Sequence, residues 1–136
     1  MQFDAEFGVQ QIGWLLAAAA AINAWLAIVH WIRRETQVAV HFSPKGGCMA
    51  AIVAEIAAAR SEILVQAYSF TCPEIAKALI AAAGRKRRVV ILLDRSNEAV
   101  TYSERGELEK HGLEVWIDSL HAIAHNKVMV IDGRTV

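Results

Sequence analysis

A long apolar segment near the N-terminus most constrains what this chain can fold into. Residues 12–32 (IGWLLAAAAAINAWLAIVHWI) contain only a glycine, an asparagine and a histidine among apolar side chains. At about 1.5 Å per residue, a helix of this length crosses the roughly 30 Å hydrocarbon core of a bilayer. Trp14 and Trp31 lie near its two ends, as aromatic residues do in spanning helices. We therefore predict one transmembrane helix over 12–32, after a short N-terminal segment 1–11. The alternative is a buried, alanine-rich helix.

Basic residues are distributed unevenly along the chain. All 14 Lys and Arg lie at or after Arg33, and Arg33 and Arg34 directly follow the apolar segment. Because positively charged flanks stay on the cytoplasmic side of a membrane, we expect a single-pass membrane protein with residues 33–136 in the cytoplasm. A periplasmic location for residues 33–136 is the alternative. Residues 1–11 contain no Lys or Arg, which argues against a cleaved signal peptide.

Helix and strand patterns alternate after the apolar segment. Strands are predicted at 37–42, 63–70, 88–94, 113–117 and 128–131, and helices at 48–60, 72–83 and 103–111. Thr71 and Glu74 are spaced as a capping box for the middle helix, and Ser103 is predicted to cap the last. This order predicts an α/β fold, with a mixed, mostly parallel sheet flanked by helices, in one domain over 33–136.

The end of the sequence carries a turn signal. Asp132 and Gly133 follow the last predicted strand and are typical of a hairpin. The sequence stops at Val136, where the returning strand would begin. Because one arm of a hairpin does not complete a sheet, we expect the domain to be incomplete at its C-terminus.

The chemistry is concentrated in a His-x-Lys-x4-Asp pattern formed by His125, Lys127 and Asp132. Residues two apart in a strand project to the same side, so the imidazole and the ammonium are expected to reach one pocket. An imidazole nucleophile beside a cation suits attack on a phosphodiester. Asp132 is at an odd separation from His125, so we expect it to face away and to act as a supporting residue.

Other polar residues are weaker candidates. Arg85, Lys86, Arg87 and Arg88 form the densest basic run, which could bind a nucleic-acid backbone or anionic lipid. The alternative for this run is a solvated turn between a helix and a strand. His121 could line the pocket of His125 or be an ordinary loop histidine.

Cysteine and aromatic residues are interpreted as structural. Cys48 and Cys72 do not form a cluster with metal-ligand spacing, so we predict no metal, no cofactor and no disulfide framework. Tyr68 and Phe70 could stack on bases, but packing in the core is the preferred interpretation. Residues 33–136 carry 14 basic and 12 acidic side chains, a balance that is compatible with a polyanionic substrate.

Four collinear segments resemble the phospholipase D superfamily, in particular its single-motif branch. That branch contains the bacterial Nuc-type endonucleases and the animal mitochondrial-surface phospholipase D-like proteins. The segments are FSP with GG at 42–47, ILVQAYSFT at 63–71, VWID at 115–118 and the stretch AIAHNKVMVID at 122–132. The resemblance covers about residues 38–136.

The resemblance implies a metal-independent phosphodiesterase in which two copies of the motif face each other. With one copy per chain, we expect a C2 homodimer. One His125 would attack phosphorus and form a phosphohistidine, and the other would protonate the leaving oxygen and then activate water. An ordinary histidine pKa of about 6.5 supplies both protonation forms near neutrality. Lys127 would stabilise the phosphate oxygens.

Three functions follow from the resemblance. The first is an endonuclease on nucleic acid, most readily single-stranded DNA or RNA. The second is a phospholipase D-type hydrolase acting on phospholipid. A basic groove would favour the endonuclease, and an apolar rim the lipid enzyme. The third is a copy that binds without catalysis, because the Ser, Asn and Glu that family members carry after the motif lie beyond Val136.

Overall fold

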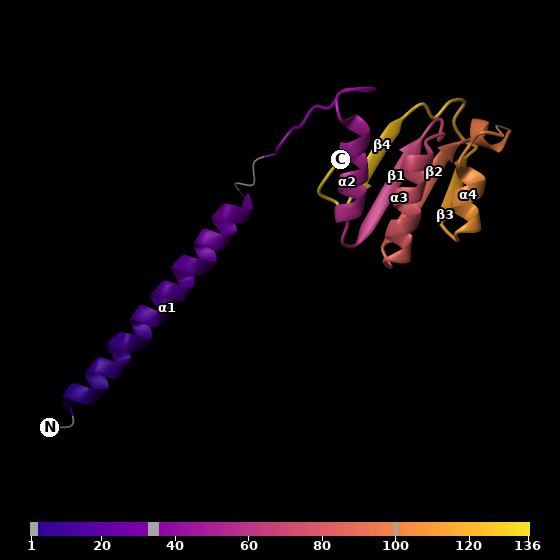
Figure 1. The fold of residues 1–136 in the computed structure, drawn as a ribbon. Helices are drawn as coiled ribbons and strands as arrows, with labels where there is room; N and C mark the ends of the chain where they lie inside the picture. The colour runs from indigo at the N-terminus through magenta and orange to yellow at the C-terminus, as the bar shows by residue number, and fades with distance from the viewer. Residues whose placement is uncertain (1–2, 33–35, 100) are drawn as a thin grey trace. The chain divides into compact units, whose positions relative to one another are not determined.

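The computed structural model describes residues 3–32, 36–99 and 101–136 of the chain (Figure 1). These residues divide into two compact units, Met1–Val40 and His41–Val136. Arg33 and Arg34, on which the predicted membrane orientation depends, lie outside the described residues.

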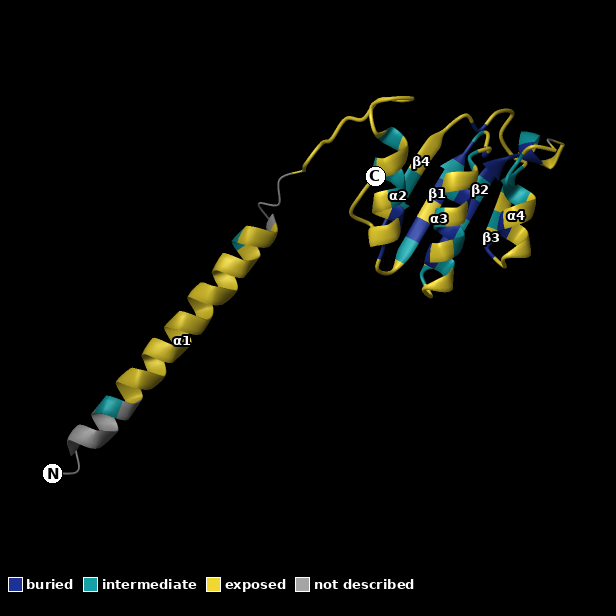
Figure 2. Cartoon of the chain, in the orientation of Figure 1, coloured by how far each residue is buried: buried dark blue, intermediate teal, exposed yellow. Residues whose placement is uncertain are grey.

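The first unit is dominated by a single helix, α1 (Phe3–Ile32). It includes a 22-residue stretch, Gln10–Trp31, that is long and apolar enough to cross a membrane. Its described side chains are almost all exposed (Figure 2). The amide of Asn23 donates to the carbonyl of Ala19 at 2.8 Å, which satisfies part of its hydrogen-bonding capacity within the helix. This is the one helix among the described residues with the length and composition of a span.

The second unit is built on a four-stranded sheet with the order β3-β2-β1-β4. The strands are β1 (Glu62–Ala67), β2 (Arg88–Asp94), β3 (Glu114–Asp118) and β4 (Lys127–Ile131). β1, β2 and β3 are parallel, and β4 pairs antiparallel with β1, so that Val65 lies opposite both Ile91 and Met129. The predicted mixed, mostly parallel sheet is confirmed.

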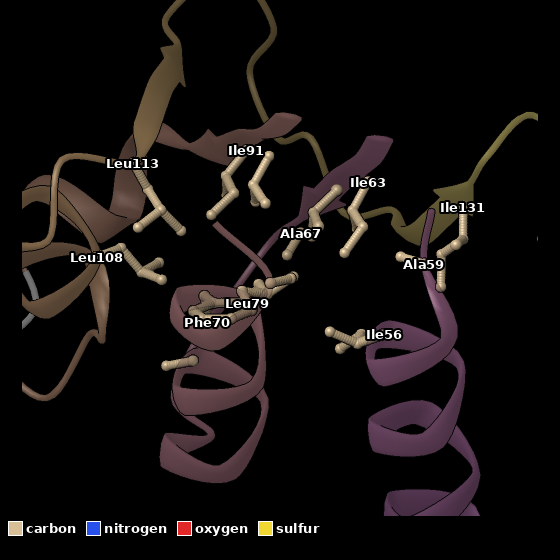
Figure 3. Close-up of a cluster of buried hydrophobic side chains, with 14 of the residues drawn as sticks. Ile56, Ala59, Ile63, Ala67, Phe70, Leu79, Ile91, Leu108, Leu113 and Ile131 are labelled. Atoms are coloured by element: carbon tan, nitrogen blue, oxygen red, sulfur yellow. The ribbon is translucent and has the colours of Figure 1, made fainter. Parts of the chain in front are cut away.

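Helices cover one face of this sheet. They are α2 (Cys48–Ala58), α3 (Pro73–Gly84) and α4 (Arg105–Lys110), with a short 3₁₀ helix η1 (Arg95–Glu98) after β2. β1, β2 and β3 follow one another in one direction across the sheet, so right-handed crossovers place α3 and α4 on the same side. Ile56, Leu79 and Leu108 from these helices are completely buried against Ile63 and Ile91 (Figure 3).

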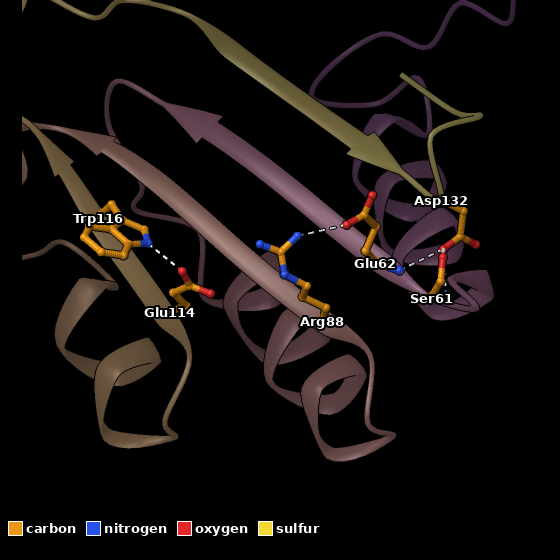
Figure 4. A network of polar contacts seen from close by, with 6 residues as sticks. All are labelled: Ser61, Glu62, Arg88, Glu114, Trp116 and Asp132. Atoms are coloured by element: carbon orange, nitrogen blue, oxygen red, sulfur yellow. Dashed lines mark hydrogen bonds and ion pairs between the residues drawn. The ribbon is translucent and has the colours of Figure 1, made fainter.

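The opposite face of the sheet is a mixture of polar and apolar groups. In the described part of the chain, Leu64, Trp116 and Val128 expose much of their surface there. Arg88 forms an ion pair with Glu62 at 3.1 Å, and both side chains are well exposed (Figure 4). An exposed pair of this kind contributes little to stability.

The predicted strand at 37–42 is wrong. Residues 37–41 adopt no regular structure, and Phe42 forms only isolated bridges to Gly46 and Gly47. The alternating pattern of Val38 and Val40 resembles a strand, but both side chains are exposed. Alternation alone does not make a strand, because the backbone groups also need a partner strand.

The predicted cap of α3 is also wrong, and that of α4 is partly correct. α3 begins at Pro73 with Cys72 as the N-cap residue, and no side chain caps it. Proline is favoured at the first helical position because its fixed φ fits the helix and its missing N–H would be unpaired there. The Thr71 side chain is therefore one residue too early. Ser103 Oγ does accept a hydrogen bond from the Arg105 N–H at 3.3 Å, although Glu104 is the N-cap residue of α4.

We expect the core of the second unit to depend on Ile91, which lies in β2, one of the two inner strands, and has no exposed surface. Ile91→Ala should lower the free energy of unfolding by about 2–5 kcal/mol, because it leaves a cavity in a packed interior. Val38→Ala, at an 83% exposed position, is the control and should change it by less than about 0.5 kcal/mol. Denaturant unfolding followed by circular dichroism measures both. Equal effects of the two variants would contradict the observed packing.

Candidate active site

His125 and Lys127 lie where β4 begins. Lys127 is opposite Ala67, the last residue of β1, and Tyr68 N–H donates to the Asn126 carbonyl at 3.0 Å, which extends the pairing by one step. Because β1 and β2 are parallel, this is the carboxyl edge of the parallel strands. Both His125 and Lys127 are exposed.

The ring of Tyr68 contacts the side chains of both residues. Its centroid is 4.5 Å from that of the His125 imidazole, and Lys127 Nζ is 5.5 Å from the same ring. At this distance the ammonium is attracted by the face of the ring. Lys127 Nζ also donates to the carbonyl of His125 at 3.4 Å. The imidazole and the ammonium therefore share one aromatic neighbour.

The role of Tyr68 was not predictable from the local pattern. The sequence pattern favoured packing in the core for both Tyr68 and Phe70, and Phe70 is indeed only 5% exposed. Tyr68 is only half-buried, because it follows the end of β1 and meets the first residues of β4. The approach of β4 to β1 determines its neighbours.

A buried asparagine holds the segment that carries Tyr68. Asn97, in η1, is 5% exposed, and its amide donates to the carbonyl of Tyr68 and to that of Asp94. Its carbonyl oxygen accepts hydrogen bonds from Phe70 N–H at 3.3 Å and from Ser103 Oγ at 3.0 Å. Asn97 was not among the candidate residues predicted from the sequence. An asparagine four residues after an apolar strand-like run is a weak signal by itself.

A second buried polar residue, Asp94, holds the segment that carries His125. It is the last residue of β2 and only 2% exposed. Its Oδ2 accepts from Ala124 N–H and its Oδ1 from Ser96 N–H, both at 2.8 Å. These hydrogen bonds, above all that from Ala124, hold the pKa of the Asp94 carboxyl below its ordinary value. An ionised carboxylate thus fixes the residue that directly precedes His125.

Asp118, at the end of β3, holds the beginning of the same loop. Its Oδ1 accepts from the N–H groups of Leu120 and His121 at 3.0 and 3.2 Å, and the His121 imidazole contacts Oδ2 at 2.8 Å. The hydrogen bond from the His121 side chain is the main reason that the pKa of Asp118 is lowered. Arg95 Nη2 adds a hydrogen bond to the Ala122 carbonyl at 3.1 Å. His121 therefore has a definite partner in Asp118.

Asp132 lies at the other end of β4. Its carboxylate accepts from the N–H of Arg60 at 2.8 Å. It also accepts from the N–H groups of Ser61 and Glu62 at 2.8 and 3.0 Å and from Ser61 Oγ at 2.7 Å (Figure 4). These hydrogen bonds, that from Ser61 Oγ foremost, hold the pKa of Asp132 far below its ordinary value. Asp132 joins the entry of β1 to the exit of β4, and the length of β4 separates it from His125.

The basic run of residues 85–88 lies at the edge of the sheet opposite His125. Arg88 is the first residue of β2 and pairs with Glu62 at the start of β1, whereas Lys127 is opposite the end of β1. Lys86 has a φ of 66° in the turn that precedes β2. The structure therefore does not bring this run to the candidate site.

Two arginines of the run bind the C-terminal end of α2. Arg85 Nη2 donates to the carbonyls of Ile56 and Ala57, each at 3.2 Å, and Arg87 Nε donates to the carbonyl of Ala59 at 3.2 Å. The last carbonyls of a helix have no partner within the helix, and cationic side chains stabilise that end. The guanidinium groups are engaged in this structural role.

The candidate site thus presents an exposed imidazole and an exposed ammonium that share one aromatic neighbour. These are the groups that enzymes using a histidine nucleophile present to a phosphate ester. The family model described as "Cardiolipin synthase, PLD-like domain" matches residues 52–136. The chain belongs to the phospholipase D superfamily, which confirms the resemblance seen in the sequence.

Individual relatives agree with this assignment. The chain is 42% identical over 101 residues to a phospholipase D of Rickettsia bellii, covering 74% of this chain and 50% of the relative. It is 32% identical over 69 residues to the mitochondrial cardiolipin hydrolase of Xenopus tropicalis, and this match covers 51% of this chain and 33% of the relative. The crystal structure of Nuc from Salmonella typhimurium superposes with a TM-score of 0.68 at 34% identity, covering 73% of this chain and 66% of Nuc. The chain spans about half the length of the phospholipase D relatives it matches.

Asp132→Asn should weaken the connection between β1 and β4. It should also make the melting temperature of the protein less dependent on pH in the acid range. A carboxylate with a depressed pKa stabilises the fold above its unfolded pKa of about 4 and loses this contribution as the pH falls towards its folded pKa. The melting temperature of the wild type should therefore fall towards that of the variant between about pH 5 and pH 2. Glu109→Gln, at an exposed helix position, is the control. A constant difference in melting temperature across this range would contradict the assignment.

Proposed function

We propose that this chain hydrolyses phosphodiesters through a phosphohistidine formed on His125, as a homodimer and without a metal ion. The observation that supports this best is the shared contact of His125 and Lys127 with Tyr68 at an exposed edge of the sheet. The imidazole attacks phosphorus, and the ester oxygen leaves with its bonding electrons and takes a proton. Water then attacks the phosphohistidine and releases the phosphate monoester and the histidine.

The proton donor comes from the second copy of the chain. The described residues of one chain provide one His-x-Lys pair at this edge, and the mechanism needs one histidine as nucleophile and one as acid. A C2 dimer places two identical groups across one axis, so two His125 side chains meet at a shared phosphate. The two Lys127 ammonium groups stabilise the negative charge that develops on its oxygens.

Nucleic acid is the first proposed substrate. This proposal rests on the resemblance to the Nuc-type endonucleases and on the 0.68 TM-score with Nuc. The basic run of residues 85–88 no longer adds support, because two of its guanidinium groups bind helix carbonyls at the other edge of the sheet. Single-stranded DNA or RNA fits best, since a flexible phosphodiester reaches His125 most easily.

Phospholipid is the second proposed substrate, and one structural observation favours it. The loop that precedes His125 exposes two large apolar side chains, Leu120 and Ile123. An apolar rim of this kind suits a substrate with acyl chains. The candidate span in α1 would hold the domain close to such a substrate, and the relatives named phospholipase D and cardiolipin hydrolase are in line with it.

His125→Ala should reduce hydrolysis by at least roughly a thousandfold, because it removes the nucleophile. The assay uses the full chain in detergent micelles with single-stranded DNA, RNA, phospholipid and bis(p-nitrophenyl) phosphate, in excess EDTA. Activity of the wild type that survives EDTA, with an acid-labile phosphate label that is absent from the variant, is the expected result. Activity that EDTA abolishes would overturn the metal-independent mechanism.

The same assay decides between the substrates and tests the dimer. Cleavage of DNA or RNA alone supports the endonuclease, and cleavage of phospholipid alone supports the lipid enzyme. Binding of a substrate without turnover would favour the non-catalytic alternative. Co-expression with increasing fractions of the His125→Ala chain should lower activity more steeply than in proportion, because a mixed dimer lacks one histidine. A proportional decrease would contradict the shared site.

Asp94→Asn should slow hydrolysis of bis(p-nitrophenyl) phosphate by roughly 10- to 100-fold, because a displacement of about 1 Å at the nucleophile has this effect. An amide offers one oxygen where Asp94 uses two, so the hydrogen bond to Ala124 or that to Ser96 is lost. Asp118→Asn is the matched control, since its loop contacts lie at Leu120 and His121, farther along the chain from His125. Equal rates for the two variants would contradict a special role for Asp94 in positioning His125.

A further inference from the structure

The loop between β3 and β4 places two large apolar side chains in solvent beside the candidate site. Leu120 is 92% exposed and Ile123 is 64% exposed. Leu120 is the most exposed large apolar side chain of the described residues. Both lie within five residues of His125. Isolated exposed apolar residues are common on protein surfaces. Two of them within the six residues 119–124, beside a candidate site, indicate a surface that contacts an apolar partner.

The loop is held in this projecting position by hydrogen bonds to the sheet. Leu120 N–H donates to Asp118 Oδ1 at 3.0 Å, and Ala124 N–H donates to Asp94 Oδ2 at 2.8 Å. Between these two points Arg95 Nη2 holds the Ala122 carbonyl at 3.1 Å. The small side chain of Ala124 is the part of the loop that is buried. Hydrogen bonds at three backbone positions therefore hold the loop so that Leu120 and Ile123 point outwards.

The exposed charged side chains on the loop and among its hydrogen-bond partners are positive, whereas the two carboxylates that hold its backbone, Asp94 and Asp118, are ionised but largely buried. Residues 119–131 contain no Asp or Glu, and Lys127 and the two histidines of this stretch are exposed. Arg95, which contacts the loop, is exposed as well. The Asp118 carboxylate at the start of the loop is occupied by three hydrogen bonds. Apolar side chains beside two exposed cations, Lys127 and Arg95, suit a surface that meets an anionic bilayer.

A bilayer would be within reach of this loop if α1 acts as the proposed anchor. Residues 33–47 join α1 to the first residue of α2, and an extended chain of this length spans at most about 50 Å. The second unit therefore stays within that distance of the membrane.

We propose that residues 119–124 form a membrane-contact loop whose Leu120 and Ile123 side chains enter the interface of an anionic bilayer. Headgroup phosphates would then lie beside His125 and Lys127. This inference rests on the proposed membrane anchor and deepens the second proposed function, because it delivers phospholipid to the site. A second copy of the chain is the competing occupant of the same surface.

The test places the photo-crosslinker p-benzoylphenylalanine at position 120 of the full chain in nanodiscs of phosphatidylcholine and phosphatidylglycerol. After irradiation, mass spectrometry identifies what the side chain has contacted. Position 110 is the matched control, because the Lys110 side chain is 75% exposed and precedes the start of β3, at the opposite edge of the sheet from the loop. Severalfold more lipid adduct at position 120 than at position 110 is the expected result. Position 123 provides a second test if the chain labelled at 120 does not fold.

Two outcomes would overturn the proposal. Crosslinks from positions 120 and 123 only to a second copy of the chain would assign the loop to the dimer interface. Equal lipid adduct at the loop positions and at position 110 would show no specific contact. The crosslinks do not require turnover, so their failure is distinguishable from the failure of the proposed phosphodiesterase activity.

Discussion

The antiparallel pairing of β4 with β1 is the interaction on which the candidate site depends. Asp132 fastens one end of this pair through four hydrogen bonds to residues 60–62. At the other end, the hydrogen bond from Tyr68 to Asn126 continues the pairing beyond the strands. Because strand pairing fixes the register, His125 and Lys127 both meet the ring of Tyr68. The three members of the His-x-Lys-x4-Asp pattern thus act at the two ends of one strand.

Carboxylates at the ends of two parallel strands complete this arrangement. Asp94 ends β2 and Asp118 ends β3, and each accepts hydrogen bonds from the loop that leads to His125. Parallel strands finish at the same edge of a sheet, so one loop can cross both carboxylates. The same edge therefore has a fixed backbone, an exposed imidazole and ammonium, and the two projecting apolar side chains. In the function that we propose, this one loop positions the nucleophile His125 and contacts a lipid surface.

Much of the fold and part of the candidate site were predictable from the sequence. Apolar runs predicted the strands of the sheet, and the His-x-Lys spacing predicted that an imidazole and an ammonium lie together. The prediction of a strand at 37–42 failed because alternation does not provide a partner strand. The interpretation of the basic run as a substrate contact depended on charge alone, whereas Arg85 and Arg87 bind carbonyls of α2, a helix distant from them in sequence.

The sequence by itself determined the apolar α1 helix, the family and the order of helices and strands, because periodicity, length and motif spacing are local properties of the chain. Only the tertiary structure decided the partners of each functional group. Tyr68 and Asp94 reach the segment of His125, and Asn97 reaches that of Tyr68, because β1, β2 and β4 lie side by side in the order β2-β1-β4, which differs from their order in the chain. The exposure of Leu120 likewise follows from the tertiary structure, in which its N–H is bound by Asp118. The sequence alone does not indicate whether a given leucine will be buried.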